Sequence, residues 1–69
     1  MGIEEYVHEI GQRLESCEDS AERVALARLL ASTGSPDAQP FILDALAAED
    51  DDDSRDAIRD ALSALDEGD

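Results

Sequence analysis

Apolar residues recur at intervals of three and four along almost the whole chain, and no run alternates with a period of two. This spacing places apolar side chains along one face of an α-helix, whereas a half-buried strand would alternate. Four segments carry the pattern, over about residues 3–17, 20–33, 36–48 and 54–67. We therefore predict an all-α fold of four helices.

The first two segments have clear faces and boundaries. In the first, the expected buried stripe consists of Ile3, Tyr6, Val7, Ile10, Leu14 and Cys17. Asp19, with Glu22 three residues later, has the pattern of a capping box at the start of the second helix. That helix is apolar over more than half of its circumference, which predicts neighbours on two sides. Gly34 supplies the left-handed residue that ends it.

The third segment contains two prolines. Ser35 and Pro36 are typical of a helix start, so we expect a helical turn over residues 36–38. Pro40 cannot donate a backbone hydrogen bond, so we place it in the first turn of the helix proper. The buried face of this helix is expected to consist of Phe41, Ile42, Ala45 and Leu46.

The fourth segment follows an acidic loop over residues 49–53. Asp53 or Ser54 is the expected N-cap, and Gly68 the expected end. The buried face is expected to consist of Ala57, Ile58, Ala61, Leu62 and Leu65.

The chain is short, acidic and poor in large apolar residues. Its 69 residues predict one small helical domain over 1–69, and 11 of the 29 apolar residues are alanine, so the core should be thin. A net charge of −14, with five arginines and no lysine, excludes direct nucleic-acid binding and a polybasic membrane anchor. Without an apolar span or a signal peptide, and with a free thiol, we expect a cytoplasmic protein.

A shift of 32 residues superimposes the chain on itself at eight positions. The pairs are Ile10 with Ile42, Leu14 with Leu46, Glu18 with Asp50, Asp19 with Asp51, Arg23 with Arg55, Ala25 with Ala57, Leu26 with Ile58, and Leu30 with Leu62. A period of this length is typical of a helical solenoid, in which each unit is one antiparallel helix pair. The predicted units are repeat 1, about residues 2–33, and repeat 2, about residues 35–67.

The second unit resembles a HEAT-like repeat. Residues 34–46 show the Pro-x-Ala-x-Pro turn and Leu-rich helix of that family, and the acidic residue, the arginine and the alanine-rich face of residues 53–62 are similar to its second helix. Residues 1–33 lack both prolines, and Ser54 stands where the family usually has valine. The resemblance implies a non-enzymatic scaffold that binds proteins.

Two repeats are fewer than a stable solenoid usually needs, so the exposed end faces require an explanation. A homodimer, docking on a partner protein, and a compact four-helix bundle all remain open. Pairs with i, i+4 spacing, Glu9–Arg13 and Asp19–Arg23, predict weak surface ion pairs, and a ladder through Arg23 and Arg55 is plausible.

No residues combine into a catalytic, cofactor or metal site. Cys17 and His8 lie nine residues apart, on opposite faces of one helix, so they cannot pair. The aspartates of residues 50–53 lack the glycine and the glutamate of a calcium loop. Asp53-Ser54 matches only two residues of a phosphopantetheine attachment turn, and capping already explains Ser54. We therefore expect no enzyme activity.

The sequence favours a protein-interaction module, and the alternative is an acidic inhibitor that mimics nucleic acid toward a basic protein. Candidate apolar contacts are Tyr6, Phe41 and Leu43, although Phe41 fits a core position better. An exposed ridge of carboxylates would support mimicry, and its candidate members are Asp44, Asp51, Asp56 and Asp60. The expected partner is another protein, in the second case one with a basic surface.

Overall fold

The computed structural model describes residues 2–67, which form four helices and no strand. Helix α1 covers Ile3–Ser16, α2 covers Ser20–Thr33, α3 covers Ala38–Ala48 and α4 covers Asp52–Glu67. The predicted all-α class and the number of helices are confirmed. Gly68, the expected end of the fourth helix, lies outside the described residues.

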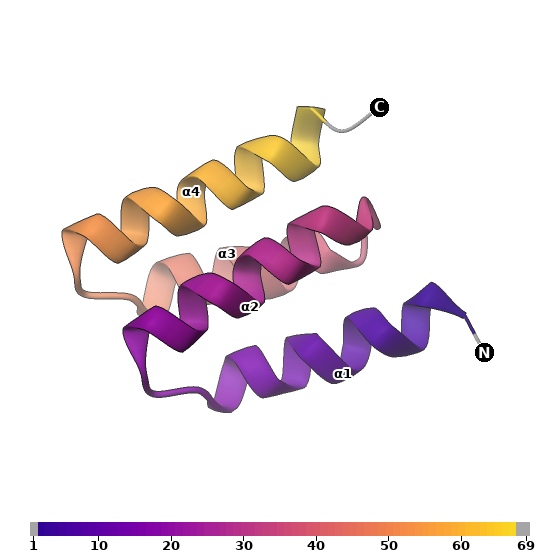
Figure 1. Cartoon of the computed structure of the whole chain (residues 1–69), viewed down its shortest axis with the longest axis horizontal. Coiled ribbons are helices and arrows are strands. Elements are labelled where there is room, and N and C mark those ends of the chain that lie inside the picture. The colour runs from indigo at the N-terminus through magenta and orange to yellow at the C-terminus, as the bar shows by residue number, and fades with distance from the viewer. Residues whose placement is uncertain (1, 68–69) are drawn as a thin grey trace.

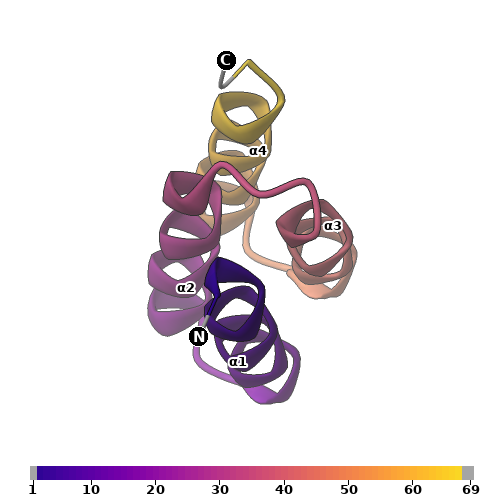
Figure 2. The ribbon, with the colours of Figure 1, turned by 90° about the vertical axis from the view of Figure 1, so that its right-hand side faces the viewer.

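Helices α1 and α2 form one antiparallel hairpin, and α3 and α4 form a second (Figure 1). The second hairpin stacks on the first with equivalent helices side by side. Helix α3 lies beside α1 and α4 lies beside α2, while α2 also contacts α3. Helices α1 and α4 do not pack together in the described chain, and Figure 2 shows them apart. A closed ring of four helices would bring α1 against α4, so the hairpins form an open stack with principal extents of 34 × 25 × 15 Å.

The core lies between the two hairpins and draws on every helix. Its largest fully buried side chains are Val7, Leu14, Leu30, Ile42 and Ile58. Each such side chain contributes roughly 1.5–3 kcal/mol on burial. Buried alanines, at Ala27, Ala38, Ala45 and Ala61, keep the helices close together.

The outer part of the predicted α1 stripe is wrong. Ile3 and Tyr6 are 54% and 43% exposed, because α2 and α3 cover the face centred on Val7 and Leu14 and leave the edge of the stripe uncovered. Gly11, which has no apolar side chain and was not expected in the core, is buried instead. A Cβ atom there would lie 2.5 Å from Cδ2 of Phe41, so the missing side chain lets the Phe41 ring rest on the α1 backbone.

The expected start and end of α2 and the expected turn before α3 are confirmed. Asp19 caps α2 by accepting a 3.1 Å hydrogen bond from the Glu22 amide, although the Glu22 carboxylate does not return the bond to the Asp19 backbone and instead accepts from Cys17. Gly34 ends α2 with φ of 69°. The Ala38 and Gln39 amides donate to the carbonyls of residues 35 and 36, which makes the predicted turn before Pro40.

The expected cap of the fourth helix is wrong. Helix α4 begins at Asp52, and the Asp51 carboxylate accepts a 3.0 Å hydrogen bond from the Ser54 amide. In a run of four aspartates followed by serine, any member can cap, and the path of the preceding loop decides which one does. Asp51 is the 32-residue counterpart of Asp19, so both second helices begin with the same capping bond.

Candidate interaction surface

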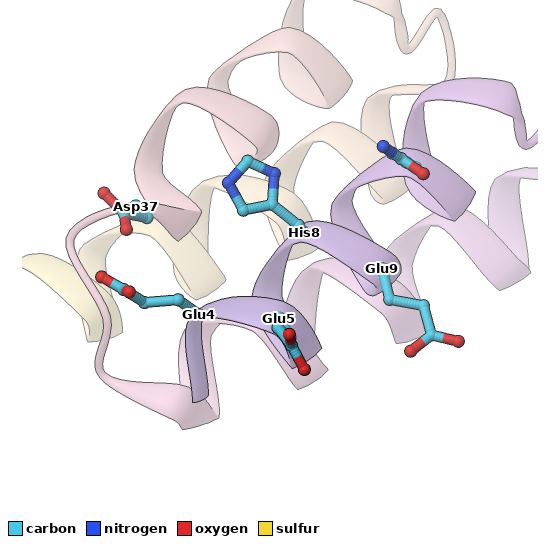
Figure 3. A pocket seen from close by; sticks show the side chains of 6 residues that line it. Glu4, Glu5, His8, Glu9 and Asp37 are labelled. Atoms are coloured by element: carbon cyan, nitrogen blue, oxygen red, sulfur yellow. The ribbon is translucent and has the colours of Figure 1, made fainter. Parts of the chain in front are cut away.

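The exposed face of α1 borders a shallow depression of about 480 Å³ (Figure 3). Its lining residues are Glu4, Glu5, His8, Glu9, Gln12 and Asp37. The His8 ring points toward α3, while Glu5 and Glu9 point away from it. The depression is acidic, but no three His, Cys, Asp or Glu side chains of the described residues are placed to hold a metal ion.

The expected apolar contact residues divide into two groups. Tyr6 and Leu43 are 43% and 44% exposed, so both are available to a partner. Phe41 is half-buried and packs against the core, and its ring meets the His8 ring edge-on at 5.8 Å, which confirms the preference for a core position. Ile3 and Leu29 are also large, apolar and exposed. Ile3 was expected in the buried stripe of α1, and Leu29 lies on the helix for which we expected neighbours on two sides.

The four candidate carboxylates are all exposed but do not share one site. Asp44 borders a depression on the α1–α3 side, together with Leu14, Glu15 and Arg23. Asp60 borders a different groove, between α2 and α4. Asp51 caps α4, and Asp56 lies one turn before Asp60. No single depression of the described chain gathers them.

The groove between α2 and α4 has an apolar floor. Its lining residues are Arg28, Ala31 and Ser32 of α2 and Asp60, Ala61 and Ala64 of α4, and its volume is about 300 Å³. Alanine side chains end at Cβ, so the two helices pack closely and still leave a channel above their contact. The sequence showed these alanines, but only the pairing of α2 with α4 makes them a surface.

Glu49 is a charged residue whose burial the sequence did not predict. We expected it in an exposed acidic loop, yet it is 3% exposed. Its Oε1 accepts a 2.7 Å hydrogen bond from Nη1 of Arg23, and its Oε2 accepts from the Ser20 hydroxyl at 2.8 Å and from the Asp51 amide at 3.1 Å. Arg23 also donates to the Cys17 carbonyl at 2.8 Å. The network joins both interhelix loops at one end of the molecule.

The environment of Glu49 favours its charged form. The Ser20 hydroxyl contributes most to lowering the pKa of the carboxyl below its ordinary value of 4.5, and the Asp51 amide and Arg23 lower this pKa further, against the opposing effect of desolvation. Every buried side-chain nitrogen or oxygen of the described residues has a hydrogen-bond partner. The network is therefore a satisfied structural site that holds two loops together.

The expected surface ion pairs are wrong for the described residues. Arg23–Glu49 is the one salt bridge within 4.0 Å there. The Asp19 carboxylate is taken by the cap of α2, so Arg23 reaches across to the second hairpin instead. Neither Glu9–Arg13 nor an arginine ladder through Arg55 forms, because exposed pairs gain little over hydration.

Cys17 is half-buried and His8 is exposed, as expected from their opposite faces. The Cys17 thiol donates to the Asp19 carbonyl at 3.3 Å and to a Glu22 carboxylate oxygen at 3.6 Å. Ser54 lies in the first turn of α4, where its amide is used by the Asp51 cap.

No helix of the described residues has the length and the apolar character needed to cross a lipid bilayer. Comparison of the chain with protein-family models, with curated proteins and with solved structures finds no match.

Proposed function

We propose that this chain is a non-enzymatic protein-interaction module built from two HEAT-like helical repeats. The observation that carries the proposal is the exposure of four large apolar side chains, Ile3, Tyr6, Leu29 and Leu43, on a molecule of net charge −14. A strongly acidic surface needs no apolar residues for its solubility. Ile3 and Tyr6 lie three residues apart on α1 and share a face, and a contiguous exposed apolar patch is typical of a contact surface.

The arrangement of the hairpins supports the repeat part of the proposal. Helices α1 and α3 lie side by side, as do α2 and α4, so the second hairpin repeats the first after a translation. The amide of Arg23 donates to the Asp19 carbonyl at 2.9 Å, and the amide of Arg55 donates to the Asp51 carbonyl at 2.8 Å. Equivalent residues of the two units thus begin equivalent helices.

Affinity capture from a lysate of the source organism tests the proposal. The tagged chain is compared with Tyr6→Ser and Leu43→Ser variants at low and high salt, with Gln12→Ser as an exposed control on α1. An apolar contact predicts a partner that survives high salt, is lost with one of the two variants and is kept by the control. Capture that is the same for all variants would contradict the assigned contact residues.

Mimicry of nucleic acid remains the second candidate, but no observation favours it over apolar docking. A single ridge of Asp44, Asp51, Asp56 and Asp60 would support it, but Asp44 and Asp60 border different depressions, which weakens it. The same capture experiment separates the two functions, because a partner held by charge alone dissociates as the salt concentration rises.

A further inference from the structure

We propose that the groove between α2 and α4 binds a basic amphipathic helix of a partner protein, with one apolar side chain of that helix resting on the alanine floor. This inference rests on the proposed function and adds the surface and the chemistry of the partner. The groove, the charges on its walls and the direction of its two helices lead to this assignment.

The floor fits an apolar side chain. Ala31 of α2 and Ala61 and Ala64 of α4 line it, and its volume of about 300 Å³ equals the share of about ten water molecules in the liquid. Water in such a channel has few polar partners, so its replacement by an apolar group is favourable. Helices α2 and α4 run in the same direction side by side (Figure 1), so a helix of the partner can lie along them and place one side chain in the groove.

The walls carry opposite charges that do not pair with each other. Arg28 stands on the α2 wall and Asp60 on the α4 wall, and the described residues contain no ion pair between them. Both charges are therefore free for a ligand. Arg28 excludes a uniformly cationic ligand from its own wall, so the cations of the partner must face α4.

Asp60, on the α4 wall of the groove, belongs to an acidic row that continues along α4 beyond the residues that line the groove. Asp53, Asp56 and Asp60 follow one another at spacings of three and four, so they lie on the same flank of α4, and all three are exposed. They span about 10 Å along the helix axis, at 1.5 Å per residue. Arg59 lies about 60° from Asp56 around the helix and Arg55 about 100° from it. Both arginines lie about 120° or more from Ala61 and Ala64, away from the groove. Lysine or arginine side chains at matching helical spacing complement this row.

A second copy of the chain fits the groove poorly. Each copy carries a net charge of −14, so two copies repel each other, and no helix of the described residues presents a basic face. A basic partner gains from the same field.

A titration of the isotopically labelled full chain, followed by NMR, tests the inference. The probe is a designed amphipathic peptide on the order of 15 residues, a length that can form a helix, with lysines on one face and a single tryptophan anchor. At about 0.15 M salt, the largest amide shifts are expected at the groove-lining residues of α2 and α4. Replacing tryptophan by alanine in the peptide should weaken binding at least tenfold.

Matched variants separate the groove from the general acidity of the surface. Ala64→Leu fills the floor at an exposed position and should weaken binding at least tenfold, whereas Ala47→Leu, at an exposed alanine of α3, should leave it within twofold. Asp60→Asn should weaken binding several-fold, and Asp44→Asn should not. Far-ultraviolet circular dichroism checks that each variant remains helical.

Binding that is indifferent to Ala64→Leu, or shifts spread evenly over all four helices, would overturn the groove assignment. Absence of binding at this salt concentration would overturn the class of partner. Neither result bears on capture through Tyr6 or Leu43, so failure here is distinguishable from failure of the proposed function.

Discussion

At the scale of single residues, Gly11 sets how closely Phe41 of α3 approaches α1. Alanine is the better helix former by about 1 kcal/mol, so at an unconstrained site Gly11→Ala would stabilise the chain. Here the added Cβ would lie 2.5–2.6 Å from three carbon atoms of the Phe41 ring, and the ring must move. Overpacking of this kind costs about 1–3 kcal/mol.

We therefore predict that Gly11→Ala lowers the free energy of unfolding by about 1 kcal/mol, because overpacking outweighs helix propensity. Urea unfolding followed by circular dichroism measures the change. In a Phe41→Ala background the same substitution should be stabilising by about 1 kcal/mol. If Gly11→Ala changes the free energy of unfolding in the same direction in both backgrounds, the contact between residue 11 and the Phe41 ring is refuted.

The residues that sequence reasoning misplaced share a physical cause. The face of α1 was assigned from spacing, but whether Ile3 and Tyr6 are covered depends on how far α2 and α3 reach around it. Glu49 was placed in an exposed loop because its ion-pair partner stands 26 residues away on another helix. Spacing within one segment carries no information about such a partner.

At the scale of the elements, the sequence was most informative. Apolar spacing, Gly34 and the prolines gave four helices and two of their boundaries, because these signals are local. The start of α4 was missed among four aspartates and a serine. The signal that could have found it was the 32-residue shift, which pairs Asp51 with Asp19, the residue already assigned as the cap of α2.

The cap of α4 gives a second prediction. Asp51→Ala removes the acceptor for the Ser54 amide and should lower the free energy of unfolding by about 1 kcal/mol. Ser54→Ala is the matched control, because the Ser54 side chain makes no capping bond, and it should stay within about 0.5 kcal/mol. Thermal unfolding of the two variants measures both values, and a larger loss for Ser54→Ala would restore serine as the cap.

At the scale of the whole molecule, net charge opposes compactness. Nineteen acidic residues outnumber five arginines, so the excess negative charges repel one another within a small volume, and salt screens this repulsion. We predict that the melting temperature rises from about 0.01 M to about 1 M sodium chloride, as the Debye length falls from roughly 30 to 3 Å. Differential scanning calorimetry follows it, and a melting temperature that falls over this range would contradict the prediction.

The buried carboxylate gives the molecule a defined response to acid. The pKa of Glu49 is lower in the folded chain than its ordinary value of 4.5, so its contribution to stability is present above that pH. The contribution is lost as the pH falls through the folded pKa. Acidification also relieves the general repulsion, so the wild type alone does not isolate this group.

Comparison of the wild type with the Glu49→Gln variant isolates the contribution of the Glu49 carboxylate to stability. The wild type should be more stable than the variant at pH 7, and the difference between their free energies of unfolding should shrink below pH 4.5. Glu9→Gln, at an exposed carboxylate of α1, provides the control for a change of one charge. A wild-type advantage that persists unchanged in acid would refute the assignment.

The most direct test of the stacked-hairpin account is a double-mutant cycle on Arg23 and Glu49 at pH 7, since this salt bridge joins the first hairpin to the second. Each single change, Arg23→Met or Glu49→Met, leaves the other charge largely shielded from solvent without its ion-pair partner and should be strongly destabilising. The double variant removes both charges and should be clearly more stable than the sum of the single changes predicts. Strict additivity would mean that the two side chains do not meet, and would contradict the way in which the hairpins are stacked here.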